Sequence, residues 1–212
     1  MRIKLALISI FVAICFNFVN LGSLAETTNL KIPLGRFTVF AQQEAPPPPI
    51  FLMVRENANW DYIKDAFPRE TNALIMDVET GKTFNVRRTF GTLHADVETL
   101  TPEDTEIMRQ IWGGWSWERR AVVVYVGDYV FAGSMAGMPH AGLDSAPALS
   151  IVNNLSGGFG RGQNLDSVKN NGMDGHVCLH FAGSRIHGSN VINAAHQTRV
   201  QEAIAYILDN YR

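Results

Sequence analysis

The sequence predicts an α+β fold, with a small β-rich core and flanking helices that include an amphipathic helix at the C-terminal end. Two observations support this prediction: β-branched runs that come in pairs around tight turns, and two segments with the signals of α-helices. The chain has 212 residues, of which 46% are hydrophobic, so a single domain can bury a substantial core.

Two β-hairpins are expected. Residues 73–78 and 83–86 are strand-like runs on either side of the turn Glu79-Thr80-Gly81-Lys82. A second pair, residues 121–126 and 129–132, flanks a Gly-Asp turn and is rich in valine. Both pairs are typical of neighbouring antiparallel strands.

Two helices are expected as well. Thr101 and Pro102 form an N-cap and a first helical residue, and the helix they open runs to about residue 112, where Gly113 and Gly114 end it. Residues 194–211 form an amphipathic helix. Its apolar stripe contains Val200, Ile204 and Ile207.

Residues 141–174 are rich in glycine, asparagine and serine and have little periodicity. So long a stretch inside a compact domain is typical of a functional loop or a lid.

The first 25 residues have the pattern of a secretory signal peptide. Arg2 and Lys4 precede the apolar run 5–16, and Ser23-Leu24-Ala25 offers small residues for cleavage. We therefore expect a protein that is secreted or held in the cell envelope, with no stable membrane span after cleavage. Residues 26–49 form a proline-rich tether, and residues 50–212 form the single catalytic domain.

The charge balance limits the partners. The 18 Lys and Arg residues against 20 Asp and Glu give a formal net charge of −2. This charge gives no large positive field, so we expect no nucleic-acid partner.

The chemistry concentrates around one cysteine. Cleavage of the signal peptide removes Cys15 and leaves Cys178, which lies between His176 and His180. In an extended segment these three side chains share one face, while Val177 and Leu179 point into the core. A thiol between imidazoles is expected to have a lowered pKa and to act as a nucleophile. The alternative is a buried strand whose histidines are structural.

The stretch Gly175-His176-Val177-Cys178-Leu179-His180-Phe181 resembles the active-site motif of the L,D-transpeptidases, cysteine enzymes that crosslink peptidoglycan. The resemblance implies that Cys178 is the nucleophile, that His176 is the motif histidine, and that Leu179 and Phe181 are its apolar flanks. It also implies that His140, in the segment Pro139-His140-Ala141-Gly142, is the general base. The implied reaction is acyl transfer on peptidoglycan stem peptides, with no cofactor, and with transfer to an amine or to water.

The motif also differs from the family pattern. Gly175 stands in place of a serine, Val177 in place of a glycine, and His180 in place of an arginine that contacts the substrate carboxylate. His180 and Arg185 are therefore the substrate-binding candidates that the resemblance leaves.

A zinc-dependent peptidoglycan peptidase or amide hydrolase is the first alternative, because imidazole, carboxylate and thiolate groups are also zinc ligands. Glu98 or Asp174 would then be the base for a zinc-bound water. The candidate ligands are His94, Asp96, His176 and His180.

The second alternative is a cell-wall binding module without catalysis. Trp112, Trp115 and Trp117 lie within six positions of one another. If they are exposed they could stack on sugar rings, and otherwise they pack as core and helix cap.

Overall fold

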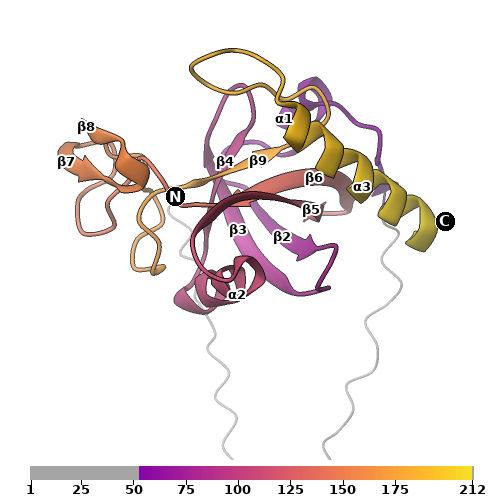
Figure 1. The fold of residues 1–212 in the computed structure, drawn as a ribbon, viewed down its shortest axis with the longest axis horizontal. Helices are drawn as coiled ribbons and strands as arrows, with labels where there is room; N and C mark the ends of the chain where they lie inside the picture. The colour runs from indigo at the N-terminus through magenta and orange to yellow at the C-terminus, as the bar shows by residue number, and fades with distance from the viewer. Residues whose placement is uncertain (1–52, 212) are drawn as a thin grey trace, which may run out of the picture. The chain divides into compact units, whose positions relative to one another are not determined.

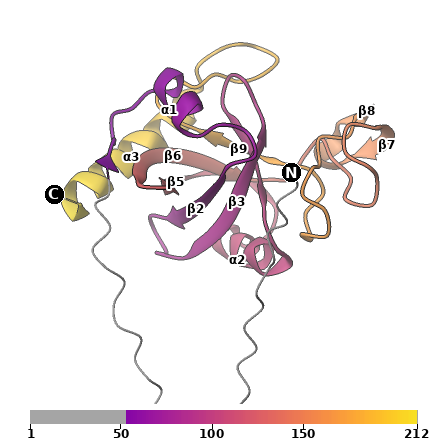
Figure 2. The same cartoon turned by 180° about the vertical axis from the view of Figure 1, so that it is seen from behind.

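The computed structural model describes residues 53–211. The predicted signal peptide, residues 1–25, and the predicted tether, residues 26–49, lie outside the described residues. Within them the expected α+β fold is confirmed: a β-rich barrel-like core carries three α-helices, one of them C-terminal (Figures 1 and 2). No helix of the described part is long and apolar enough to cross a membrane.

Six strands close on themselves to form the barrel. In order around the barrel they are β5, β2, β3, β4, β9 and β6, and β6 pairs with both β9 and β5. The strands span Asn72–Asp77 (β2), Thr83–Phe90 (β3), Ala95–Thr99 (β4), Ser116–Val126 (β5), Tyr129–Gly137 (β6) and Val177–His180 (β9). The short β1, Met53–Val54, pairs in parallel with β6.

The first predicted hairpin is confirmed as β2 and β3, which pair in antiparallel. The Asp77 carboxylate accepts hydrogen bonds from the N–H and the hydroxyl of Thr80. Gly81 follows with φ +67°, a conformation that favours glycine. Arg120 on β5 donates to the same carboxylate at 2.8 and 3.0 Å, so the turn is also tied to the neighbouring strand.

The second predicted hairpin is confirmed as β5 and β6, with Gly127 at φ +54° in the turn. Both strands are longer than the sequence pattern indicates, because β5 begins at Ser116 and β6 continues to Gly137. The register shifts between Ser116 and Arg119, a bulge that lets the polar start of β5 join the ladder.

The three helices pack on the outside of the barrel. Helix α1, Trp60–Ala66, is capped by Asn59. Helix α2, Pro102–Trp112, begins after the Thr101 cap and ends at Gly113 in the left-handed conformation, as predicted. Helix α3, Ala194–Asn210, covers β5 and β6, and its buried stripe includes the three predicted residues Val200, Ile204 and Ile207.

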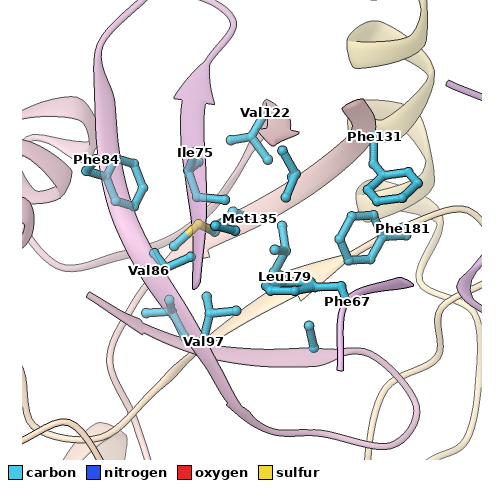
Figure 3. Packing of buried hydrophobic residues seen from close by; sticks show 14 of the residues in the cluster. Phe67, Ile75, Phe84, Val86, Val97, Val122, Phe131, Met135, Leu179 and Phe181 are labelled. Atoms are coloured by element: carbon cyan, nitrogen blue, oxygen red, sulfur yellow. The ribbon is translucent and has the colours of Figure 1, made fainter. Parts of the chain in front are cut away.

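Apolar side chains from all six strands fill the barrel interior (Figure 3). The alternation of β9 is confirmed, because Val177 and Leu179 are fully buried in this core. Phe181 follows them and stacks on Trp60 of α1, with ring centroids 5.8 Å apart. A second apolar cluster lies between α3 and the outer face of β5 and β6.

Residues 141–174 are more ordered than the sequence pattern indicates. They contain the two-stranded sheet of β7, Ile151–Leu155, and β8, Gly160–Gln163, which extends from the barrel on the side away from α3 (Figures 1 and 2). The buried Asn164 organises this insertion, since its amide donates to the carbonyls of Leu143, Ala146 and Pro147. The insertion is thus a folded subdomain with hydrogen bonds of its own.

Candidate active site

A pocket of about 710 Å³ lies between the barrel and the 141–174 insertion. Its wall brings together residues from β3, β4, β5 and β9, from the insertion and from the loop 186–188. The chemically relevant ones are His94, Asp96, His140, His176, Cys178 and His187. The structure therefore collects in one place most of the residues that the sequence singled out.

Strand pairing sets the positions of the predicted nucleophile and the predicted base. Cys178 lies on β9 with Asp96 of β4 as its partner in the ladder. Just before β9, His176 pairs with His140, which follows β6. His140 Nε2 lies 3.5 Å from Cys178 Sγ, within hydrogen-bonding reach for a sulfur atom.

The His140 ring is oriented by the backbone. Its Nδ1–H donates to the Met138 carbonyl at 2.9 Å, which leaves Nε2 as the acceptor facing the thiol. The rings of Trp117 and Phe159 lie 5.1 and 5.2 Å from the imidazole, one on β5 and the other in the insertion. His140 is thus a base with one defined tautomer and an aromatic surround.

The protonation states differ from the sequence-based expectation. Burial raises the pKa of the Cys178 thiol, and the Asp96 carboxylate raises it further. Burial also lowers the pKa of His140 to about 4, with His176 as the second cause. The expected lowering of the cysteine pKa was wrong, because desolvation and a neighbouring carboxylate outweigh the imidazoles. The resting pair is a neutral thiol and a neutral imidazole.

Asp96 is the centre of the polar part of the site. Its carboxylate lies 3.1 Å from His94 Nε2, 3.4 Å from His187 Nε2 and 3.7 Å from His176 Nε2. Burial alone would raise the pKa of Asp96, but the contacts with His187 and His94 outweigh it and lower the pKa. Asp96 is therefore an ionised carboxylate inside the protein, surrounded by imidazoles.

Comparisons with protein-family models, with curated proteins and with solved structures find no match to this chain.

Two predicted site residues lie apart from the pocket wall. His180 packs behind it, stacked between His94 and His196 with ring centroids 4.2 and 3.8 Å away. Arg185 lines a separate pocket of about 280 Å³ beside α1, and its guanidinium donates to the Asn190 carbonyl. The geometry brings Cys178, His140 and His176 together and leaves these two substrate-binding candidates outside.

The possible bases for a zinc-bound water also lie elsewhere. Glu98 is fully buried on β4, where its carboxylate accepts the backbone N–H groups of Ser167 and Val168. Burial raises its pKa to about 7. Asp174 accepts from the Asp144 N–H within the insertion. Both carboxylates hold the insertion in place.

Three pocket residues were not assigned to the Cys178 site from the sequence. Trp117, one of the three tryptophans considered for sugar binding, is 44% exposed and lies beside His140, whereas Trp112 is buried. Arg69 is an exposed cation on the pocket wall, and His187 reaches Asp96 from a distant loop. The spacing of Arg69 and His187 in the sequence carries no signal of these contacts.

Proposed function

We propose that this chain is an exported cell-wall enzyme that carries out L,D-transpeptidase-like acyl transfer on peptidoglycan stem peptides, with Cys178 as nucleophile. The observation that carries the proposal is the 3.5 Å contact between Cys178 Sγ and His140 Nε2, in a pocket and with the His140 tautomer fixed. A nucleophile, a base and a group that orients the base are the minimum for this chemistry.

The reaction begins from the neutral pair. The thiol proton moves to His140 Nε2 as Sγ attacks the amide carbonyl next to a D-centre, so that charge separation occurs only during attack. His140 then gives this proton to the leaving amine as the C–N bond breaks, which leaves a thioester on Cys178. An acceptor amine then attacks the thioester and gives a proton to His140, the C–S bond breaks, and the proton passes to Sγ, so that the crosslink forms and the thiol is restored. Water in place of the amine gives the carboxypeptidase product by the same steps. Backbone N–H groups near Val177 and Cys178 are the candidate donors to the oxyanion.

The pocket wall supports a peptide with a terminal carboxylate. Arg69 takes the role of carboxylate contact, since it is an exposed residue that lines the pocket. Trp117 and Phe159 supply exposed aromatic rings next to His140, against which the stem peptide packs.

The test uses the chain without its signal peptide and purified muropeptides with tetrapeptide stems. Intact-mass measurement is expected to detect a covalent acyl-enzyme on Cys178, and Cys178→Ser and His140→Gln are expected to abolish crosslinked product. If Cys178→Ala still cleaves the stem peptide, and a chelator abolishes this cleavage, the result would instead establish zinc hydrolysis. Muropeptide binding without product or adduct in the wild-type protein would establish a binding module, and either result overturns the proposal.

A further inference from the structure

Two atoms on the pocket side of the site are buried and lack hydrogen-bond partners among the described residues: His94 Nε2 and Asp96 Oδ1. They lie 3.1 Å apart, but because Nδ1 carries the proton of the His94 ring, both atoms are acceptors and make no hydrogen bond to each other. Buried polar atoms without partners are costly, and in native proteins they usually have a ligand or another role. The acyl-transfer mechanism uses neither atom.

A third ligand atom faces the same carboxylate. His187 Nε2 lies 3.4 Å from Asp96 Oδ2, and one ligand atom each from His94, Asp96 and His187 all fall within 4.8 Å of one another. Zinc bound at about 2.0–2.1 Å in a tetrahedron places its ligand atoms roughly 3.3 Å apart. His94 Nε2 lies 3.1 Å from Asp96 Oδ1 and His187 Nε2 lies 3.4 Å from Asp96 Oδ2, so each nitrogen is at about this separation from one oxygen of the carboxylate.

The outer contacts also suit a metal ligand. His94 Nδ1–H donates to the Arg185 carbonyl at 2.7 Å, which fixes the ring and leaves Nε2 free to bind an ion. Metal-binding histidines commonly donate their other ring N–H in this way. The loop that carries His187 is held by the hydrogen bond from the Ile186 N–H to the Val191 carbonyl. His187 is partly exposed, so an ion could enter from the pocket.

We propose that His94, Asp96 and His187 bind a divalent transition-metal ion of the zinc class, with its open coordination position toward the pocket. Two neutral imidazoles and one carboxylate form a ligand set that favours such ions over calcium or magnesium. This site does not depend on the proposed acyl transfer, because it is defined by ligands that the mechanism does not use.

A competing set, His94 with Cys178 and His180, is less suitable. Its ligand atoms also lie within 4.8 Å, and His180 Nδ1 is buried without a partner among the described residues. The His94 and His180 rings are nearly parallel, however, at 20° and 4.2 Å between centroids. Because an imidazole lone pair lies in the plane of its ring, the lone pairs of two stacked rings lie in nearly parallel planes and converge poorly on one ion.

The test is metal binding by the chelator-treated protein, measured by calorimetry with Zn²⁺ and by the absorption of bound Co²⁺. We expect one ion per chain, at least tenfold weaker binding in His187→Ala, and unchanged binding in the matched variant Cys178→Ala. His187 is an exposed side chain, so its loss leaves the fold intact. Ca²⁺ and Mg²⁺ at the same concentration are expected not to bind.

Three results would overturn this inference: no saturable binding of Zn²⁺, unchanged affinity in His187→Ala, or loss of binding in Cys178→Ala. The last result would assign the ion to the competing set. Because no peptidoglycan is present in these measurements, their outcome is independent of whether the chain transfers acyl groups.

Discussion

His140 and His176 exchange two backbone hydrogen bonds, with each N–H donating to the other residue's carbonyl, at 2.9 and 3.2 Å. This bridge joins the segment after β6 to the segment before β9, and so it connects the base to the strand that carries the nucleophile. The distance between His140 and Cys178 is therefore set mainly by backbone pairing, which is more rigid than side-chain packing alone.

The bridge requires a glycine at position 175. Gly175 has φ +87°, and a Cβ there would overlap the His140 carbonyl oxygen and the backbone of Gly142. We expect Gly175→Ser to lower the free energy of unfolding by about 3 kcal/mol or more, measured by denaturant unfolding. Gly158→Ala is the control, because Gly158 also has positive φ but no atom lies near its Cβ position. Equal losses in both variants would contradict the steric explanation.

The thiol is expected to react slowly at neutral pH. Burial and then Asp96 raise the pKa of Cys178, so alkylation by iodoacetamide should increase only above the ordinary cysteine pKa of about 8.5. In chelator-treated protein, Asp96→Asn is expected to speed alkylation several-fold at pH 8.5, because it removes a nearby negative charge. Asp174→Asn, in the insertion, serves as the control and should change little. A wild-type thiol that titrates below pH 8 would refute this prediction.

The buried His140 is expected to make the folded protein less stable in acid. Its pKa is about 4 in the folded protein and about 6.5 when unfolded, so between these values the unfolded state binds the extra proton. The contribution of the neutral His140 to the free energy of unfolding is complete above pH 6.5 and is lost as the pH falls toward 4. The stability of the wild type relative to His140→Gln should fall by about 3 kcal/mol between pH 7 and pH 4. Urea unfolding at several pH values measures this difference, and a constant difference would exclude a depressed pKa.

Glu98 gives the opposite pH dependence. Burial raises its pKa to about 7, so the folded state holds a proton that the unfolded state releases near pH 4.5. Stability is therefore lost as the pH rises from 4.5 to 7. Glu98→Gln keeps an acceptor for the Ser167 and Val168 N–H groups and removes the charge. Relative to the wild type, this variant should gain about 3 kcal/mol between pH 4.5 and pH 8, measured by thermal and urea unfolding. A gain that does not change with pH would argue against ionisation of Glu98.

The elements that sequence reasoning predicted correctly are those defined by local signals. The Thr101 cap, the Gly113 stop and the two hairpin turns depend on residues within a few positions of one another. The alternation of β9 is also local, which is why Val177 and Leu179 were placed correctly in the core.

The features that could not be predicted depend on contacts distant in sequence. His187 meets Asp96 across 91 positions, and Arg69 reaches the same pocket from before β2. His180 shares a face of β9 with Cys178, but β9 crosses from pairing with β4 to pairing with β6, and at that end the side chain packs against His94 and His196. The alternation of residues predicts which face of a strand a side chain lies on, but it does not predict which residues of other elements that side chain contacts.

The closure of the barrel affects how exposed Cys178 is to oxidation while the chain is folding. Strand β9 is the last of the six barrel strands in sequence, and it pairs with β4 and β6 at once. Until this strand docks, Cys178 is a solvated thiol with an ordinary pKa, and it is more readily oxidised than the half-buried thiol of the finished barrel, whose pKa is raised. Folding therefore protects the sulfur as it assembles the site, and a chain that stalls before closure is the form most vulnerable to oxidative damage.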